Sequence, residues 1–293
     1  MPRLRKEQSC LNSVVSGESR MFKYSKFDGV LVALSLAHIA CWVVPVVWFN
    51  ELSIASLLIL ALANILLMCT NYQCVAHNFI HNPFFKSRLG NLVFSVINTL
   101  ALGMPQSFYK AHHINHHVFN NDGWVGDQPP KDRSSLYLYG SDAGEESALR
   151  YTLLSYFRLS VTELFKDAYQ RVGALVMIEI SILVFAVTLT LIYQPLAFVL
   201  FVIPVHYLGT SMASLENYAE HHGCDPANSM SNSVSSYSRL YNLLWFNNGY
   251  HQEHHCMPDI HWFRLPETRS KMLDERERKV IRGSHFFSVF KES

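Results

Sequence analysis

Histidines in four short groups are the residues whose type and spacing could do chemistry in this chain. The chain has 15 histidines among 293 residues, and 11 of them fall in these groups. The groups are His77 and His81; His112, His113, His116 and His117; His221 and His222; and His251, His254 and His255. Core histidines are usually solitary, whereas neutral imidazole is the commonest side-chain metal ligand. The grouping therefore predicts a metal centre.

The spacing within the groups would bring imidazoles to one face of a helix. His77 and His81 are four residues apart, and two blocks of His-x-x-His-His repeat the spacing i, i+3, i+4. The two blocks, the pair His77 and His81, and His221 together supply nine imidazoles. One zinc ion takes about four protein ligands, so nine imidazoles predict two metal ions. Imidazole suits iron, copper, zinc or nickel, and the spacing alone leaves that choice open.

Composition excludes several other classes of protein. The chain has 24 Lys and Arg against 23 Asp and Glu, a net charge of +1, so no basic surplus exists to neutralise a nucleic acid. Its six cysteines contain no Cys-x-x-Cys, which argues against a disulfide scaffold or a zinc ribbon. Because 49% of the residues are hydrophobic, disorder is excluded as well.

Four apolar segments are long enough to cross a membrane, which takes about 20 helical residues. They are residues 29–49, 52–69, 172–193 and 195–215, and none contains Lys or Arg. The joints at 50–51 and 194–195 are so short that the segments must form two antiparallel hairpins. All Lys and Arg then fall on one side, including Arg3, Arg5, Lys6, Arg20, Lys23 and Lys26. The positive-inside rule makes that side cytosolic, with both termini on it.

A fifth apolar stretch, residues 91–104, is only about 21 Å long as a helix. We interpret it as a re-entrant helix, because a crossing there would put His77 and His81 opposite His112 to His117; a short fifth span is the alternative. All four histidine groups then lie on the cytosolic face. The predicted fold is an all-α integral membrane protein with four transmembrane helices in two hairpins, a re-entrant helix and a cytosolic helical cap carrying the histidines.

The remaining segments have simpler interpretations. Residues 120–130 are typical of a loop, and apolar residues four apart predict one amphipathic helix over 145–170, lying on the membrane or capping the site. The charged stretch 267–282 predicts a solvated helix. The predicted organisation is a cytosolic arm at 1–28, a membrane domain at 29–266 and a cytosolic charged tail at 267–293.

The histidine pattern resembles the membrane fatty acid desaturases and their hydroxylase relatives. Those proteins have three histidine boxes, and His77/His81, His113/His116/His117 and His251/His254/His255 match them in order. The sequence from His254 to Pro266 is similar to a lipid desaturase motif, with His261 in place of its second proline. The stretch from Asn217 to Gly223 resembles an alkane hydroxylase motif, and His112 fits the hydroxylase spacing where His113 fits that of desaturases.

The resemblance implies a centre of two iron ions that uses dioxygen, at the cytosolic end of the spans. It implies a lipid or fatty acyl desaturase, with a fatty acyl or alkane hydroxylase, or an oxidative decarboxylase, as the runner-up; a membrane metal transporter is a remote alternative. The implied metal ligands are nine histidines, namely the eight histidines of the three boxes and His221. In the second box the first ligand is either His112 or His113. Asn217 is a possible water-mediated ligand. Carboxylates that could orient the imidazoles are Glu220, Glu253, Asp122 and Asp127.

The chain shows no dinucleotide, iron–sulfur or haem motif, so the prediction includes a separate electron donor of the ferredoxin, rubredoxin or cytochrome b5 type. The membrane is a bacterial inner membrane or the endoplasmic reticulum. His206 precedes His221 by about 22 Å of helix, too far to share its metal. His38 and Glu179 lie inside spans and are expected to have buried hydrogen-bonding roles or to line a substrate tunnel. His285 is expected at the surface.

Overall fold

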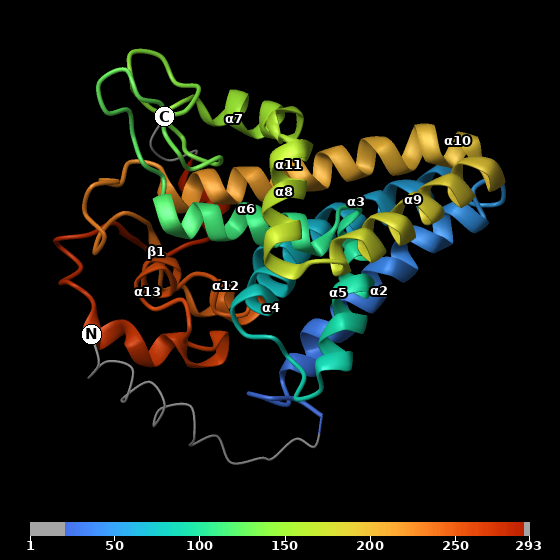
Figure 1. Cartoon of the computed structure of the whole chain (residues 1–293), viewed down its shortest axis with the longest axis horizontal. Helices are drawn as coiled ribbons and strands as arrows, with labels where there is room; N and C mark the ends of the chain where they lie inside the picture. Colours follow the sequence, from blue (N-terminus) through green and yellow to red (C-terminus); the bar gives the residue numbers. More distant parts are fainter. Residues whose placement is uncertain (1–20, 290–293) are drawn as a thin grey trace.

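The computed structural model describes residues 21–289, and this part of the chain is mostly helical. The predicted basic arm lies largely outside the described residues, with Arg3, Arg5, Lys6 and Arg20. Four described helices are long and apolar enough to cross a membrane: α2 (Asp28–Val47), the helix Ile54–His81, α9 (Leu175–Tyr193) and the helix Pro195–His221. They confirm the four apolar segments predicted from hydropathy. Figure 1 shows them running together toward one end of the molecule.

Two of these helices are longer than their apolar segments. The first consists of α3 (Ile54–Thr70), a π-helical turn η1 (Asn71–Ala76) and α4 (His77–His81). The second consists of α10 (Pro195–Ala197), a π-helical turn η3 (Phe198–Val202) and α11 (Ile203–His221). The helices therefore continue past the ends of the apolar segments at 69 and 215. Past its apolar segment the first of these helices has buried polar side chains: Asn71 donates to the Leu67 carbonyl of its own preceding turn, and Gln73 donates to the Ala213 carbonyl of α11.

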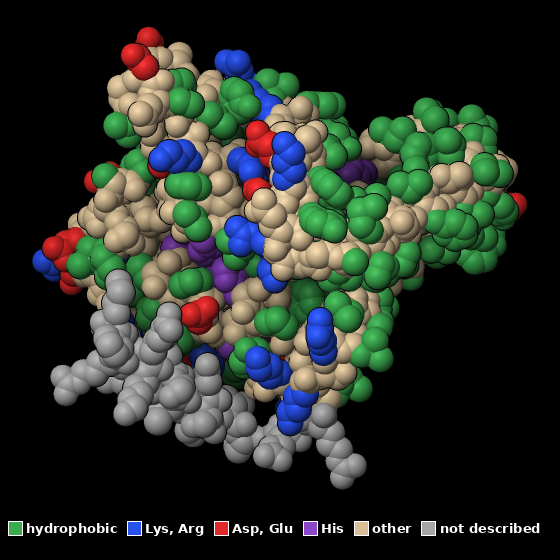
Figure 2. Space-filling model, in the orientation of Figure 1, with side chains coloured by type: hydrophobic (Ala, Val, Ile, Leu, Met, Phe, Trp, Pro, Cys, Tyr) green, Lys and Arg blue, Asp and Glu red, His purple; other side chains and the backbone are tan. Residues whose placement is uncertain are grey.

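The long helices pack directly on one another. α3 packs against α11, and a Cβ atom at Gly209 would lie only 2.7 Å from the Cβ atom of Met68. α2 packs against α3 and α5 (Arg88–Leu102), and α5 packs against α9. Hydrophobic side chains cover the projecting end of this bundle, which shows almost no charge in Figure 2. Exposed apolar residues such as Ile59, Phe185 and Ile192 give the bundle the surface expected of a protein that lies in lipid.

The short apolar helix α5 leads into the helix of the second histidine group. Ser87 caps α5, and Gly103, with φ of 63°, ends it before α6 (Gln106–Phe119) begins. His206 closes this turn, since its Nε2 atom lies 3.0 Å from the Leu102 carbonyl oxygen. His206 therefore has a structural contact, as expected from its distance along the chain to His221.

The single helix predicted over 145–170 is wrong. The structure has α7 (Ala148–Leu154), a 3-10 turn η2 (Ser155–Arg158) and α8 (Val161–Val172). Leu159 and Ser160 are extended between them, and the Ser160 side chain accepts a hydrogen bond from the Glu163 amide, which caps a new helix. An apolar residue at every fourth position does not reveal such a break, because the spacing continues across it.

The solvated helix predicted over 267–282 is also wrong. A 3-10 helix η4 (Trp262–Lys271) is followed by turns and β2 (Val280–Ile281), which pairs in parallel with β1 (Ser235–Ser236). Arg278 is buried there, and its Nη1 atom lies 3.4 Å from the Glu253 carboxylate. η4 packs against α13 (His251–Cys256), and the rings of His285 and Phe286 on α14 (His285–Ser288) contact Tyr241 of α12 (Arg239–Leu244) and Trp245. The C-terminal segment is thus part of the folded unit, because the ion pair of Arg278 with Glu253 holds it against α13.

Polar residues inside the spans are buried and hydrogen-bonded. Glu179 accepts hydrogen bonds from the Ser95 hydroxyl at 2.6 Å and from the Ser107 amide at 2.9 Å. It thereby links α9 to α5 and α6. The Nδ1 atom of His38 lies 3.0 Å from the Asn71 side-chain nitrogen. Of the two roles expected for His38 and Glu179, the structure shows the hydrogen-bonded one.

We expect Glu179→Leu to destabilise the bundle, because it leaves the buried hydroxyls of Ser95 and Ser107 without their acceptor. The cost of such buried unsatisfied groups is about 1–3 kcal/mol each. Thermal unfolding of the purified protein in detergent would show a lower midpoint. Glu275→Leu, at an exposed ion pair, is the matched control and should change the midpoint little. Equal effects of the two substitutions would contradict this role of Glu179.

Candidate metal centre

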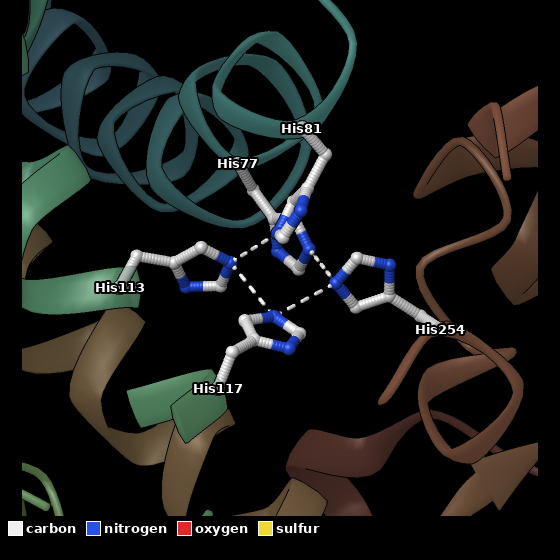
Figure 3. Close-up of side chains that lie close together, drawn as sticks. All are labelled: His77, His81, His113, His117 and His254. Atoms are coloured by element: carbon white, nitrogen blue, oxygen red, sulfur yellow. Dashed lines mark hydrogen bonds between the residues drawn. The ribbon is translucent and has the colours of Figure 1, made fainter. Parts of the chain in front are cut away.

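Nine of the grouped histidines converge in two adjacent clusters. The first cluster is His77, His81, His113, His117 and His254; the second is His116, His221, His251 and His255. Within each cluster the candidate ligand atoms all lie within 4.8 Å of one another, so each could hold a metal ion. Figure 3 shows the rings of the first cluster, from α4, α6 and α13, pointing toward one common centre.

The imidazoles face each other in a way that hydrogen bonds cannot satisfy. The Nε2 atom of His254 lies 2.7 Å from that of His77 and 3.0 Å from that of His117. The Nε2 atom of His113 likewise faces two others, those of His81 and His117, at 2.8 and 3.0 Å. Each Nε2 atom has one in-plane site, either a lone pair or a proton. Nitrogens that converge in this manner fit a cation at their centre.

The second cluster has the same character. The Nε2 atom of His251 faces those of His221 and His255 at 3.2 and 3.0 Å, and the Nε2 atom of His116 is buried without a hydrogen-bond partner in the part of the chain that the structure describes. The two clusters adjoin, since the rings of His117 and His255 stack with centroids 4.5 Å apart. A donor set of nitrogen alone, in two adjoining clusters, fits two borderline metal ions such as iron.

Two of the second ring nitrogens of the second cluster have oxygen partners. The Nδ1 atom of His116 lies 2.7 Å from the Asp132 carboxylate, and that of His221 lies 3.1 Å from the Asn232 carbonyl oxygen. These two contacts fix the orientation of their rings and aim Nε2 at the cluster centre. The Nδ1 atom of His251 lies 3.4 Å from the Glu220 carboxylate but makes no hydrogen bond to the described residues.

Burial keeps the histidines outside the spans in the neutral form that binds metal. It lowers the pKa of His113, His117, His251, His254 and His255 well below the ordinary value, and the neighbouring imidazoles lower it further. Burial alone would raise the pKa of Asp132, but His116 and Ser134 hold it well below its usual range. The centre thus combines neutral imidazoles with one firmly ionised carboxylate.

Of the four acids predicted to orient imidazoles, Glu220 lies beside a cluster histidine. Asp122 instead accepts hydrogen bonds from the backbone amides of Lys131 and Asp132, and Asp127 is exposed. Glu253 accepts hydrogen bonds from Ser235 and Tyr237 and pairs with Arg278. Its neighbours therefore lie toward the C-terminal segment. The sequence did not single out Asp132, because only the folded loop brings it to His116.

The structure also shows where three other residues considered in the sequence lie: His112, Asn217 and His285. His113, and not His112, belongs to a cluster; the Nδ1 atom of His112 is buried without a hydrogen-bond partner among the described residues. Asn217 donates a hydrogen bond to the Tyr151 hydroxyl at 2.8 Å. The expectation that His285 lies at the surface is wrong, because its side chain is fully buried and contacts the Val234 carbonyl and Tyr241. The folded tail carries it inside.

A buried acid that the sequence did not indicate lies behind the second cluster. Glu216 accepts hydrogen bonds from Tyr241 and Trp245, and with Glu220 and His285 it forms a third group of close ligand atoms. Glu216 and Glu220 are one helical turn apart on α11, which is the signal that could have revealed them.

A cavity of about 320 Å³ reaches both clusters. His77 and His113 of the first cluster and His116 and His251 of the second line it, and the exposed residues Tyr139 and Glu163 lie at its rim. Some histidine side chains are visible at the surface of the face shown in Figure 2. A substrate in this cavity could therefore contact the histidine clusters directly.

Comparison with known proteins identifies the class to which this fold and centre belong. A model of the family described as fatty acid desaturase matches residues 51–285, which include all nine clustered histidines. The chain therefore belongs to the fatty acid desaturase family. The match extends past the predicted boundary at 266 and includes the folded segment with β2.

Two curated relatives are sphingolipid delta(4)-desaturases. The one from Candida albicans is 25% identical over 214 residues, which are 66% of this chain and 56% of that protein. The one from Komagataella phaffii is 26% identical over 263 residues, which are 85% of this chain and 68% of that protein. The chain thus spans little more than half the length of the first relative.

We expect Asp132→Asn to weaken metal binding by about 10–100-fold, because the amide orients the His116 ring less firmly than the carboxylate. Metal per chain, measured by mass spectrometry after dialysis against graded chelator, would report the change. Asp127→Asn is the matched control in the same loop. A metal content that falls equally in both variants, or in neither, would contradict the assigned role of Asp132.

Proposed function

We propose that this protein is an oxygen-dependent lipid desaturase with a centre of two iron ions. The family supports lipid desaturation, and the single observation that carries the proposal is the convergence of nine imidazoles in two adjoining clusters. The overall reaction removes two hydrogen atoms from neighbouring lipid carbons and takes two electrons and two protons from outside. One dioxygen is reduced to two waters, and one carbon–carbon double bond remains.

In this proposal the two histidine clusters are the iron ligands. Bound iron supplies the oxidant for an unactivated C–H bond, which no side chain can provide. The chain itself does the rest: Asp132 and the Asn232 carbonyl orient the rings, and the cavity positions the lipid. Asn217 helps to fix the cavity wall, because it donates a hydrogen bond to the Tyr151 hydroxyl, which in turn donates to the Ser134 carbonyl beside the cavity.

The names of the two relatives favour a sphingolipid as the substrate class. A hydroxylase would use the same clusters, but the family and both relatives support desaturation. A metal transporter would place its ligands near the membrane midplane on broken helices. Here the clustered histidines lie at and beyond the ends of the long helices, at His77, His81 and His221.

We further propose that the clusters lie on the cytosolic side and that α5 dips into the membrane without crossing it. Glu51 and Gln194 then mark the outer turns, and the electrons come from a separate cytosolic donor. The uneven distribution of Lys and Arg supports this orientation. The folded C-terminal segment belongs with the membrane domain proposed at 29–266, because Arg278 in that segment forms an ion pair with Glu253 on α13.

Expression in a host of known lipid composition tests the proposed function. We expect new double bonds in host or supplied lipids by mass spectrometry, and none with His77→Ala or His254→Ala, because each removes an imidazole from the first cluster. His222→Ala is the control, since His222 lies outside both clusters and contacts Glu145. Hydroxylated lipids without new double bonds would refute desaturation and indicate the hydroxylase.

Single cysteines in an otherwise cysteine-free variant test the orientation. We expect a cysteine at Glu51 to react with an impermeant maleimide added outside intact cells, because that turn has no basic residue to retain it in the cytosol. A cysteine at Glu275 should react only after permeabilisation. Labelling at the reverse positions would overturn the orientation while leaving the proposed chemistry untouched.

A further inference from the structure

The cavity that reaches the histidine clusters is mostly apolar, as a space for a hydrocarbon chain would be, but part of its wall is polar. Thr210, Ser214 and Asn217 lie at i, i+4 and i+7 on α11 and line it, so one face of that helix is polar along the cavity. The opposite loop adds Ser134 and Ser135. A polar part of the substrate would be well solvated in this space, close to the clusters.

Five residues that line this cavity have a buried polar atom without a hydrogen-bond partner among the described residues. Three of them, His116, Glu220 and His251, belong to the second cluster or contact it. The other two atoms are the Nδ1 atom of His112 and the Nη1 atom of Arg133. Arg133 is fixed in place, because its other nitrogens contact the Asp167 carboxylate at 2.7 Å and the Glu163 carboxylate at 3.4 Å. Buried polar atoms are nearly always paired, so a ligand in the cavity is the natural partner of these two.

Both arginines that line the cavity are paired with carboxylates. Arg158 makes a two-pronged ion pair with Glu146, and Arg133 is paired as described above. A phosphate or a coenzyme A group needs a cationic surplus, which these residues do not supply. The cavity therefore suits an uncharged polar group.

We propose that His112 and Arg133 bind the uncharged hydroxyl and amide head of the lipid, so that the carbons next to this head are the ones desaturated. His112 directly precedes the cluster residue His113, which places the head close to the first cluster. The Nη1 atom of Arg133 donates to a head-group oxygen, and His112 pairs with a second polar atom of the head. This inference rests on the proposed desaturase function and specifies its substrate as a neutral lipid with an amide and hydroxyls at one end.

Binding to the iron-loaded full-length protein in nanodiscs, without reductant, tests the proposal. The probe is a tritiated saturated N-acyl-2-amino-1,3-diol lipid, and the competitor is a saturated acyl-coenzyme A. We expect Arg133→Gln and His112→Leu each to weaken probe binding about tenfold or more, as the loss of a buried hydrogen bond predicts. Iron per chain should stay at the wild-type level, because neither residue belongs to a cluster.

Matched variants keep the test decisive. Arg264→Gln is the control, since Arg264 also has a buried unpaired Nη1 atom and an ion pair with a glutamate but does not line the cavity. Arg133→Lys and His112→Gln serve if the first variants are not monodisperse. Both should also weaken binding, because lysine lacks the forked guanidinium and glutamine lacks the imidazole geometry.

The outcomes separate this inference from the proposed function. Unchanged probe binding in the variants, equal loss with Arg264→Gln, iron loss with His112→Leu, or tighter binding of acyl-coenzyme A than of the probe would each overturn the head-group site. New double bonds far from the head would do the same while leaving desaturation intact. Variant-dependent probe binding without any double bond in the supplied lipid would support the site and refute the desaturase.

Discussion

The convergence of imidazole nitrogens on two adjoining points is the constraint on which the rest of the structure depends. Nitrogens such as the Nε2 atoms of His113 and His254 each face two others, and their single in-plane sites cannot satisfy both neighbours by hydrogen bonds. A cation resolves this conflict. Because the clustered histidines come from α4, α6, α11 and α13, their convergence requires four distant segments of the chain to meet at one place.

The long helices meet this requirement through buried polar contacts as well as apolar packing. Gln73 links the helix Ile54–His81 to α11 by a hydrogen bond to the Ala213 carbonyl, just before this helix carries His77 and His81 into the first cluster. The π-helical turn Asn71–Ala76 precedes them immediately, in keeping with the frequent occurrence of such turns at functional sites. The C-terminal segment then supports α13 from outside through the contact of Arg278 with Glu253.

The oxygen atoms around the clusters divide into two sets with different effects. Asp132 and the Asn232 carbonyl lie beside ring nitrogens and orient the second cluster. The polar side chains of α11 and of the loop at 133–135 face the cavity and could solvate a bound molecule there. The first set thus acts on the histidine clusters, whereas the second set faces the space beside them.

The sequence by itself determined the four apolar helices, the histidine groups and the family, because hydropathy and the i, i+3, i+4 spacing are local properties of a helix. Only the tertiary structure decided that His113 and not His112 joins a cluster, that Asp132 replaces Asp122 and Asp127, and that His285 is buried. These outcomes depend on how loops and the C-terminal segment fold back. Contacts between residues far apart in the chain leave no periodic signal in the sequence.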